Sequence, residues 1–254
     1  MTDLLTRRRL IGALGVGAGG ILLSGCDRIA HAPAVRRVLS LGQDASFSVQ
    51  RLVTDRAALA PEFTRAEMSP VFRTNGNATV ASPDYARLAA GRFADWRLRV
   101  DGLVARPLSV SLDRLHAMPH RTQITRHDCV EGWSAIGQWT GTPLNLLLRE
   151  AGLRRDARYI VFHCADTFGT TPYYESIDLV DAFHPQTILA WGMNGRALGI
   201  GHGAPVRLRV ERQLGYKQAK YVMRVEAVAS LADIGGGKGG YWEDVGNYQW
   251  YAGI

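Results

Sequence analysis

The sequence predicts an α+β domain of mixed strands with short helices. Two kinds of segment carry this prediction: apolar or alternating runs that suit strands, and short apolar runs at helical spacing that begin and end at capping residues. With 254 residues, 46% of them hydrophobic, the chain can bury one sizeable core. A glycine-rich stretch at 235–240 predicts a flexible loop near the end of the chain.

Five segments have the character of strands. Residues 96–102 alternate between apolar and polar side chains, which predicts a strand with one buried face. Apolar runs at 159–162 and 188–191 are short enough for buried strands, and residues 206–211 and 221–227 alternate again. The second half of the chain is therefore predicted to be mostly sheet.

Capping residues predict two short helices. Ser111 suits the N-cap of a helix that ends before Pro119. Thr142 followed by Pro143 has the form of an N-cap and a first helical residue, and this helix is expected to end at Gly152.

The segment at 27–70 is harder to interpret. Residues 38–41 are a candidate strand, residues 45–59 a candidate short amphipathic helix, and residues 60–70 an irregular segment that leads into the core.

The segment at 1–25 resembles an export signal of the twin-arginine type. The arginines at 7–9 precede a weakly apolar, glycine-rich run at 12–23, which is too short and too diluted for a stable transmembrane helix. This route exports proteins that are already folded, so it favours a cofactor protein in the periplasm. The run ends in a sequence similar to a lipoprotein cleavage box, in which Cys26 would be acylated; an ordinary cleaved signal is the alternative.

The net charge is moderate and has no long basic run. The formal charge is +7, and the segment at 1–25 contributes +2 from three arginines and one aspartate, which leaves +5 from Cys26 onward. A scattered excess of this size argues against a nucleic-acid-binding tail and fits an anionic cofactor or partner.

Cys129 lies in the segment HDCVEGWS at 127–134, which has an unusual composition. A cysteine flanked by ionisable and small residues is poor material for a core, and its thiolate is a soft metal ligand and a nucleophile. We expect it on a loop between a strand and the helix after Thr142, where catalytic groups usually lie. Three cysteines cannot build a disulfide framework, and if Cys26 is acylated only Cys129 and Cys164 remain.

Several sequence blocks from residue 70 to 254 resemble, in the same order, the sulfite-oxidase-type molybdopterin-dependent oxidoreductases. The segment after the cysteine is most similar to the bacterial periplasmic methionine-sulfoxide-reductase catalytic subunits. The resemblance implies that family's fold in a domain at 71–254, preceded by an extension at 26–70 and the signal at 1–25. The blocks are DCVEGWS at 128–134, WTGTPL at 139–144, MNG at 193–195, HGAPVRL at 202–208 and GYKQAKY at 215–221.

The resemblance also assigns roles to residues. It implies that Cys129 ligates molybdenum and that the phosphate-bearing pterin is held by a set spread over the domain. A phosphate monoester needs fixed cations, which Arg207 and Lys220 can provide. The implied cofactor-binding residues are Asn75, Cys129, Cys164, His202, Arg207, Gln218, Ala219 and Lys220. Two positions depart from the reductases, because His202 stands in place of asparagine and Cys164 in place of threonine.

The implied cofactor is molybdenum–molybdopterin without an attached mononucleotide, one per chain. The sequence has neither a haem-attachment motif nor an iron–sulfur cysteine cluster. Electrons are therefore expected to pass to or from a separate partner, such as a membrane b-type or periplasmic c-type cytochrome. The chain ends soon after its last predicted strands, so we expect no C-terminal immunoglobulin-like dimerisation domain and a monomer.

The residues after Cys129 indicate the substrate class. Sulfite oxidases have a basic segment there, whereas this chain has Glu131 and Trp133, a carboxylate and an indole. A carboxylate repels an anion, so we expect reduction of neutral S-oxides or N-oxides. Cys129 and Trp133 are the expected catalytic residues, and Trp133 or nearby aromatic residues would line the entry to the site. A sulfite-oxidising dehydrogenase of the same family is the alternative.

Two other classes of protein stay open from the residues alone. His127, Cys129, His163 and Cys164 contain the elements of a zinc site, although their spacing departs from structural zinc sites. An anchored, noncatalytic binding protein with a Cys129–Cys164 disulfide is another. Singly, Arg207 would suit a solvated strand face, and Cys164 a small core position.

Overall fold

The computed structural model describes residues 33–53, 55 and 57–254, so the export signal and Cys26 lie outside the described residues. The chain divides into two units, Met1–Asp55 and Arg56–Ile254. The compact unit thus begins at Arg56, whereas the sequence analysis placed the domain boundary at 71. None of the described helices is both long and apolar enough to cross a membrane.

The first unit contains one described helix, α2 (Pro33–Val53). The candidate strand at 38–41 was therefore wrong, and the amphipathic helix expected at 45–59 begins earlier and ends at Val53. The reason is that apolar residues repeat at helical spacing through the whole of 35–53, a period that two consecutive apolar residues at 38–39 conceal locally.

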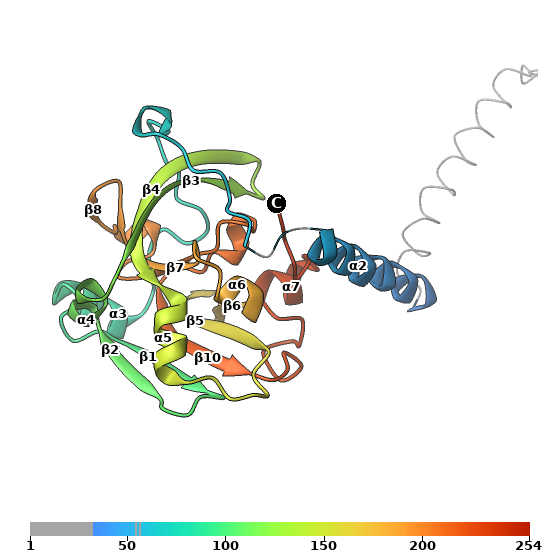
Figure 1. The fold of residues 1–254 in the computed structure, drawn as a ribbon. Helices are drawn as coiled ribbons and strands as arrows, with labels where there is room; N and C mark the ends of the chain where they lie inside the picture. Colours follow the sequence, from blue (N-terminus) through green and yellow to red (C-terminus); the bar gives the residue numbers. More distant parts are fainter. Residues whose placement is uncertain (1–32, 54, 56) are drawn as a thin grey trace, which may run out of the picture. The chain divides into compact units, whose positions relative to one another are not determined.

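The second unit is built on two five-stranded sheets, which confirms the α+β class (Figure 1). The first sheet has the order β2-β1-β10-β5-β6, in which β1 and β10 run parallel and the other neighbours antiparallel. Its strands are β1 (Arg97–Gly102), β2 (Leu108–Ser111), β5 (Tyr159–Phe168), β6 (Thr171–Asp178) and β10 (Val222–Val228).

The second sheet is antiparallel and has the order β3-β4-β7-β8, with β9 also paired to β7. Its long β3–β4 hairpin arches over the other strands in Figure 1. The strands are β3 (Arg121–Cys129), β4 (Trp133–Pro143), β7 (Ile188–Met193), β8 (Arg196–Ala197) and β9 (Arg207–Arg209).

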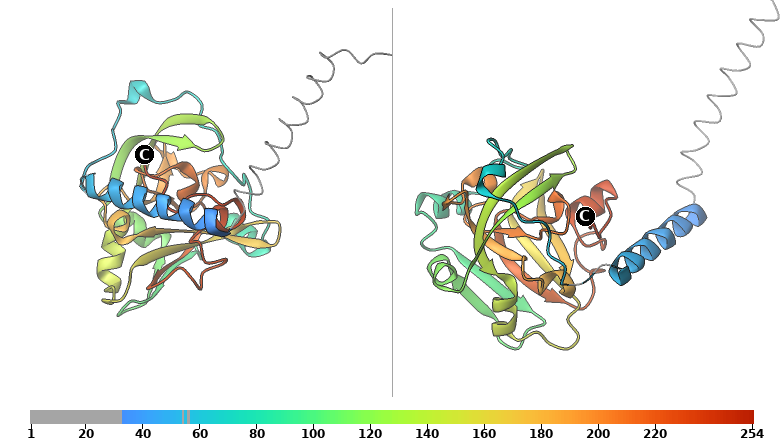
Figure 2. Two further views of the ribbon diagram at one scale, coloured as in Figure 1. Left: turned by 90° about the vertical axis from the view of Figure 1, so that its right-hand side faces the viewer. Right: turned by 45° about the horizontal axis from the view of Figure 1, so that its top comes forward.

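Short helices connect and flank the sheets, and α7 packs beside β6 (Figure 2). They are α3 (Pro83–Ala90), α4 (Leu112–Ala117), α5 (Leu144–Ala151), α6 (Leu179–Ala182) and α7 (Tyr241–Gly246), with 3-10 turns η1 (Arg65–Glu67), η2 (Ile200–His202) and η3 (Gly215–Lys217). Ser111 caps α4 as predicted, by accepting a hydrogen bond from the backbone of Arg114.

The expected capping role of Thr142 was wrong. Pro143 occupies the N-cap of α5, and the hydroxyl of Thr142 instead donates to the carbonyl of Leu115 at 2.9 Å. Gly152 does end the helix, with φ +69° in the left-handed region.

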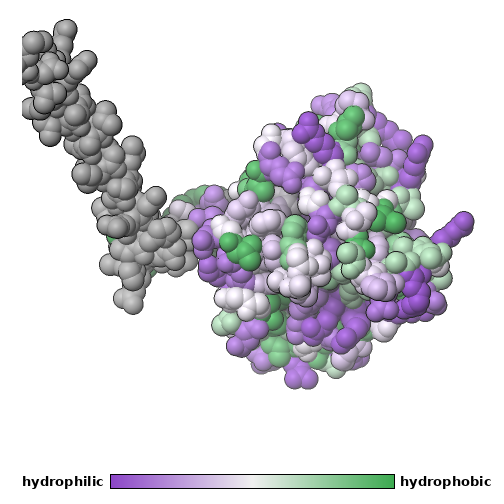
Figure 3. Space-filling model, turned by 180° about the vertical axis from the view of Figure 1, so that it is seen from behind, coloured by the Kyte–Doolittle hydropathy of each residue, from purple (hydrophilic) through white to green (hydrophobic). Residues whose placement is uncertain are grey.

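One large apolar cluster, which includes Trp96, Leu98, Leu147, Phe162 and Val225, packs the first sheet against its helices. A smaller cluster around Trp139 lies on the second sheet. On the face shown in Figure 3, the described surface is mostly hydrophilic and its apolar residues are scattered.

Candidate functional site

Cys129 is the last residue of β3 and pairs with Trp133 of β4, so it lies at the tip of the long hairpin. The prediction that Cys129 lies on a loop was wrong in detail, because strand β3 continues through the cysteine. Only residues 130–132, between the two strands, form the turn. The turn is closed by a hydrogen bond from the Gly132 amide to the Cys129 carbonyl at 3.1 Å. Gly132 has φ +84°, a conformation that favours glycine.

A cavity of about 160 Å³ opens beside Cys129. Four of the predicted cofactor-binding residues line it together, although they come from distant parts of the chain: Asn75, Cys129, Gln218 and Lys220. Its other wall residues include Gly76, Asn77, Val130, Glu131, Asp166, Phe168, Tyr173, Gly215, Tyr216, Trp242 and Tyr248.

The loop that carries Asn75 is held through its neighbour Asn77. The side-chain amide of Asn77 donates to Asp166 Oδ2 at 3.0 Å, and its carbonyl accepts from the Tyr221 hydroxyl at 2.7 Å and from Lys220 Nζ. Lys220 also donates to the carbonyl of Gly201 at 2.9 Å. One lysine thus ties the Asn75 loop and η2 to the same side of the cavity.

Unpartnered polar atoms gather around this cavity. Among the described residues, buried atoms without a hydrogen-bond partner include Asn75 Oδ1, Asp166 Oδ1 and Gln218 Oε1 from the wall, and His202 Nδ1 and Arg207 Nε next to it. An unsatisfied buried polar atom costs free energy, so a concentration of them indicates a polar ligand. These atoms include oxygen acceptors and nitrogen atoms, and a pterin that carries a phosphate has both donors and acceptors to pair with them.

The electrostatics of the cavity also fit an anionic ligand. Burial, followed by the charge of Arg207, lowers the pKa of Lys220 to about 7. Burial and the same arginine lower the pKa of His202. A bound phosphate would favour the protonated form of Lys220, because an opposite charge offsets the cost of desolvation.

Arg207 lies outside the cavity wall and is completely buried, so the solvated strand face that its pattern suggested was wrong. Its guanidinium donates to the carbonyls of His202 and Gln218, both at 3.2 Å, and lies 5.0 Å from the ring of Trp139. Arg207 therefore joins the two segments that carry predicted cofactor contacts. Ala219 is a buried core residue, and its carbonyl accepts from the backbone of Leu208.

Cys164 packs against the large apolar cluster, and it does not line the cavity as defined by the residues above. Burial raises the pKa of its thiol well above the usual value, and both Cys129 and Cys164 are free thiols. The predicted role of Cys164 in cofactor binding stays a prediction, and the alternative disulfide is not formed.

The zinc alternative finds no matching geometry. Among residues 33–254 with a described placement, no group of three histidine, cysteine or acidic side chains is arranged to hold a metal. His163 is instead hydrogen bonded to Glu226 at 2.8 Å.

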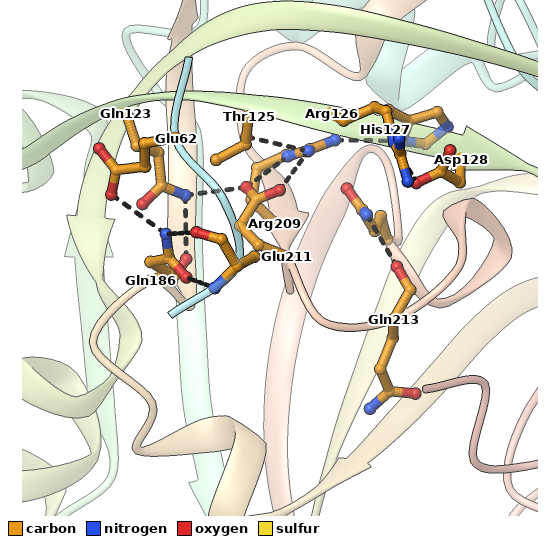
Figure 4. A network of polar contacts seen from close by, with 12 residues as sticks. Glu62, Gln123, Thr125, Arg126, His127, Asp128, Gln186, Arg209, Glu211 and Gln213 are labelled. Atoms are coloured by element: carbon orange, nitrogen blue, oxygen red, sulfur yellow. Dashed lines mark hydrogen bonds and ion pairs between the residues drawn. The ribbon is translucent and has the colours of Figure 1, made fainter. Parts of the chain in front are cut away.

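A polar network that the sequence analysis did not predict supports the hairpin from below (Figure 4). Arg209 Nη1 contacts His127 Nδ1 at 3.1 Å and forms an ion pair with Glu211, whose Oε1 also accepts from Gln123 at 2.8 Å. All four side chains are buried. Polar residues facing inward from β3 thus fix the strand that ends at Cys129.

Gly215 completes the cavity wall next to this network. A Cβ at this position would lie 2.5 Å from His127 Nε2, so only glycine allows the two segments to approach. His127 itself is neutral, because burial and the charge of Arg209 lower its pKa well below the usual value.

Trp133 supports the cavity indirectly. Its indole Nε1 donates to Glu131 Oε2 at 3.0 Å, and its ring lies 5.4 Å from that of His127. Glu131 is the member of this pair that lines the cavity beside Cys129. The catalytic role predicted for Trp133 stays a prediction.

The aromatic wall of the cavity consists of Phe168, Tyr173, Tyr216, Trp242 and Tyr248. It is positioned by buried charge: Lys217 of η3 pairs with Glu175 of β6 and Glu243 of α7, and all three are fully buried. The hydroxyl of Tyr173 donates to the carbonyl of Tyr216 at 2.7 Å. A single aromatic residue in the sequence does not predict such a wall. The high density of aromatic residues after residue 240 is a weak indication of it.

A single cysteine beside a polar, partly aromatic cavity with unpartnered buried atoms is the arrangement expected of an oxidoreductase that holds a molybdenum–pterin cofactor. Residues 86–233 match the family "Oxidoreductase molybdopterin binding domain". The chain belongs to this family, and it is a molybdopterin-dependent oxidoreductase of the sulfite-oxidase type.

Named relatives agree with this assignment. The chain is 38% identical over 250 residues to YedZ1 of Azospira oryzae, named as a protein-methionine-sulfoxide reductase subunit, covering 98% of this chain and 88% of that protein. It is 32% identical over 249 residues to the protein-methionine-sulfoxide reductase catalytic subunit MsrP of Ralstonia nicotianae, covering 87% and 68%. Among solved structures, the sulfane dehydrogenase SoxCD of Paracoccus pantotrophus matches with 26% identity and a TM-score of 0.49, over 54% of this chain and 39% of that chain.

Proposed function

We propose that this oxidoreductase reduces neutral S-oxides of the methionine-sulfoxide type at the cavity beside Cys129. The observation that carries the proposal is Glu131, which places a carboxylate on the cavity wall two residues after the cysteine. A carboxylate near the reacting centre disfavours a doubly charged sulfite and leaves a neutral S-oxide unaffected. The names of the two curated relatives support the same substrate class.

The residues of the cavity would have three different roles in this reaction. Cys129 would hold molybdenum, which, when bound, supplies oxygen-atom and electron transfer at an open coordination position. Asn75, Gln218 and Lys220 would bind and orient the pterin and its phosphate. Phe168 and Trp242 would exclude water from the thioether side of the substrate.

Reduction of an S-oxide to a sulfide and water consumes two electrons and two protons. Lys220 lies on the cavity wall, where a bound phosphate would keep its ammonium group protonated. Electrons would come from a separate partner, a membrane b-type or periplasmic c-type cytochrome. The mononucleotide-free form of the cofactor, one per chain, belongs to the same proposal.

Oxidation of sulfite is the second candidate, and one feature favours it. Histidine at 202, where the reductases have asparagine, is the choice similar to sulfite oxidases. The two directions are separated by a paired assay on the molybdenum-loaded protein. Reduced viologen with methionine sulfoxide is compared with sulfite and ferricyanide.

We expect turnover of methionine sulfoxide and weak oxidation of sulfite. The variant Glu131→Gln keeps an acceptor for Trp133 and removes the charge, so it should lower KM for sulfite and leave KM for the sulfoxide unchanged. Glu67→Gln, on the exposed turn η1, is the matched control and should change neither. Fast sulfite oxidation without sulfoxide reduction would overturn the proposal.

We also propose that the protein works in the periplasm after twin-arginine export, with a lipid on Cys26. Replacing Arg7, Arg8 and Arg9 with lysine keeps the charge and should leave the precursor in the cytoplasm. Cys26→Ala should weaken the membrane association of the exported protein, and association that is unchanged in that variant would argue against a lipid on Cys26.

A further inference from the structure

The sequence of helix α2 gives it two faces of opposite character. With 3.6 residues per turn, one side collects apolar or small residues and the other side collects the polar ones. Among the residues whose side chains are described, the apolar stripe consists of Val35, Leu41, Gly42, Ala45, Ser46, Val49, Leu52 and Val53.

Most of the described side chains of this stripe are open to solvent, and Val35 is half-buried. Leu52 is 85% exposed, Val53 74%, Leu41 66% and Val49 56%. Exposed apolar residues that follow one face of a 21-residue helix indicate a surface that is covered by something else.

The charges of α2 identify what covers it. The helix contains three arginines, at 36, 37 and 51, and one acidic residue, Asp44. Helical spacing places Arg51, the one of these four residues whose side chain is described, on the side opposite the apolar stripe. The guanidinium of Arg51 lies 5.6 Å from the ring of Phe47, on that same polar side.

We propose that α2 lies in the interface of an anionic lipid bilayer, with its apolar stripe among the acyl chains and its arginines at the headgroups. A helix with a strong apolar face, a basic polar face and low average hydrophobicity has the properties of interfacial helices. It is too polar to cross the bilayer, in agreement with the absence of a membrane-spanning helix among the described residues. A helical partner or a second copy would not need the excess of arginine.

The experiment measures hydrogen–deuterium exchange of residues 45–53 in the full chain. The chain carries Cys26→Ala, so that an acyl chain cannot contribute. We expect phosphatidylglycerol vesicles to slow exchange in this segment several-fold, phosphatidylcholine vesicles to have a smaller effect, and added salt to weaken the effect of the anionic lipid.

Two variants with the same added charge test the stripe itself. Val49→Asp with Leu52→Asp should abolish the protection by vesicles, whereas Ser48→Asp with Gln50→Asp, on the flanks of the stripe, should retain most of it. All four positions are exposed, so neither variant disturbs a core. Equal loss in both variants would show simple charge attraction and overturn the proposal. Protection that appears without vesicles and grows with protein concentration would assign the stripe to a second copy instead.

Discussion

Arg209 Nη1 lies 3.1 Å from His127 Nδ1, and both side chains are completely buried. A guanidinium can only donate, so Nδ1 must be the acceptor, and the proton of the neutral imidazole is on Nε2. That N–H points to the segment of Gly215 and Gln218, at the cavity wall. Arg209 therefore fixes the orientation of a histidine two residues before the proposed metal ligand.

Adding a methyl group at residue 215 should disturb this arrangement. In Gly215→Ala the new Cβ would lie 2.5 Å from His127 Nε2. We expect the free energy of unfolding to fall by about 1–3 kcal/mol, as for other overpacked sites, together with a lower molybdenum content. Gly199→Ala is the control, because its nearest side-chain atom is 4.0 Å away. Equal effects of the two changes in urea unfolding would contradict the assigned contact.

Breaking the ion pair of Arg209 with Glu211 should strongly lower the free energy of unfolding. Both side chains are fully buried, so Arg209→Met leaves a carboxylate without its partner. We expect a loss of about 3–5 kcal/mol in the free energy of unfolding. The control Arg99→Met removes a pair whose arginine side chain is 66% exposed, and it should cost less than about 1 kcal/mol. A small loss in the Arg209 variant would mean that water reaches the network.

Lys220 should make the stability of the cofactor-free protein depend on pH. Its pKa of about 7 in the fold lies below the unfolded value of 10.5, so the charged form destabilises the fold. This penalty is complete below pH 7 and disappears as the pH rises towards 10.5. Lys220→Met should therefore raise the melting temperature relative to wild type more at pH 6 than at pH 10.

The opposite trend, or none, would show that Lys220 is charged and well solvated in the fold. Cofactor loading provides a second readout, since the same variant should hold less molybdenum once its cation for the phosphate is removed.

Cys164→Ser separates the two described cysteines. The side chain packs against the large apolar cluster, so the change should lower stability moderately and leave molybdenum content and turnover close to wild type. If this variant is the inactive one and Cys129→Ser is active, the roles of the two cysteines are reversed.

The strands with apolar alternation were predictable, and the strand that carries the site was not. β1, β5, β7 and β10 overlap the predicted segments, because the buried residues of those segments are apolar. In β3 the buried positions include Gln123, Thr125 and His127, so hydrophobic periodicity gives no signal. The burial of these polar side chains is made acceptable by Arg209 and Glu211, which lie in a distant part of the sequence.

The site was predictable where its residues form short local blocks. Asn75, Cys129, Gln218 and Lys220 were expected to meet, and the fold brings them to one cavity. The position of Arg207 could not be foreseen, because its burial depends on the carbonyls of two other segments. The aromatic wall depends likewise on the buried pairing of Lys217 with residues of β6 and α7.

X-ray absorption at the molybdenum edge of the loaded protein tests the central claim most directly. A pterin dithiolene and the Cys129 thiolate should give three sulfur neighbours in the wild type. Cys129→Ser, in which a hard alkoxide replaces a soft thiolate, should show two sulfur neighbours and no turnover. Three sulfur neighbours retained in the serine variant, or a wild-type protein that purifies without molybdenum and pterin under conditions that supply both, would contradict the account.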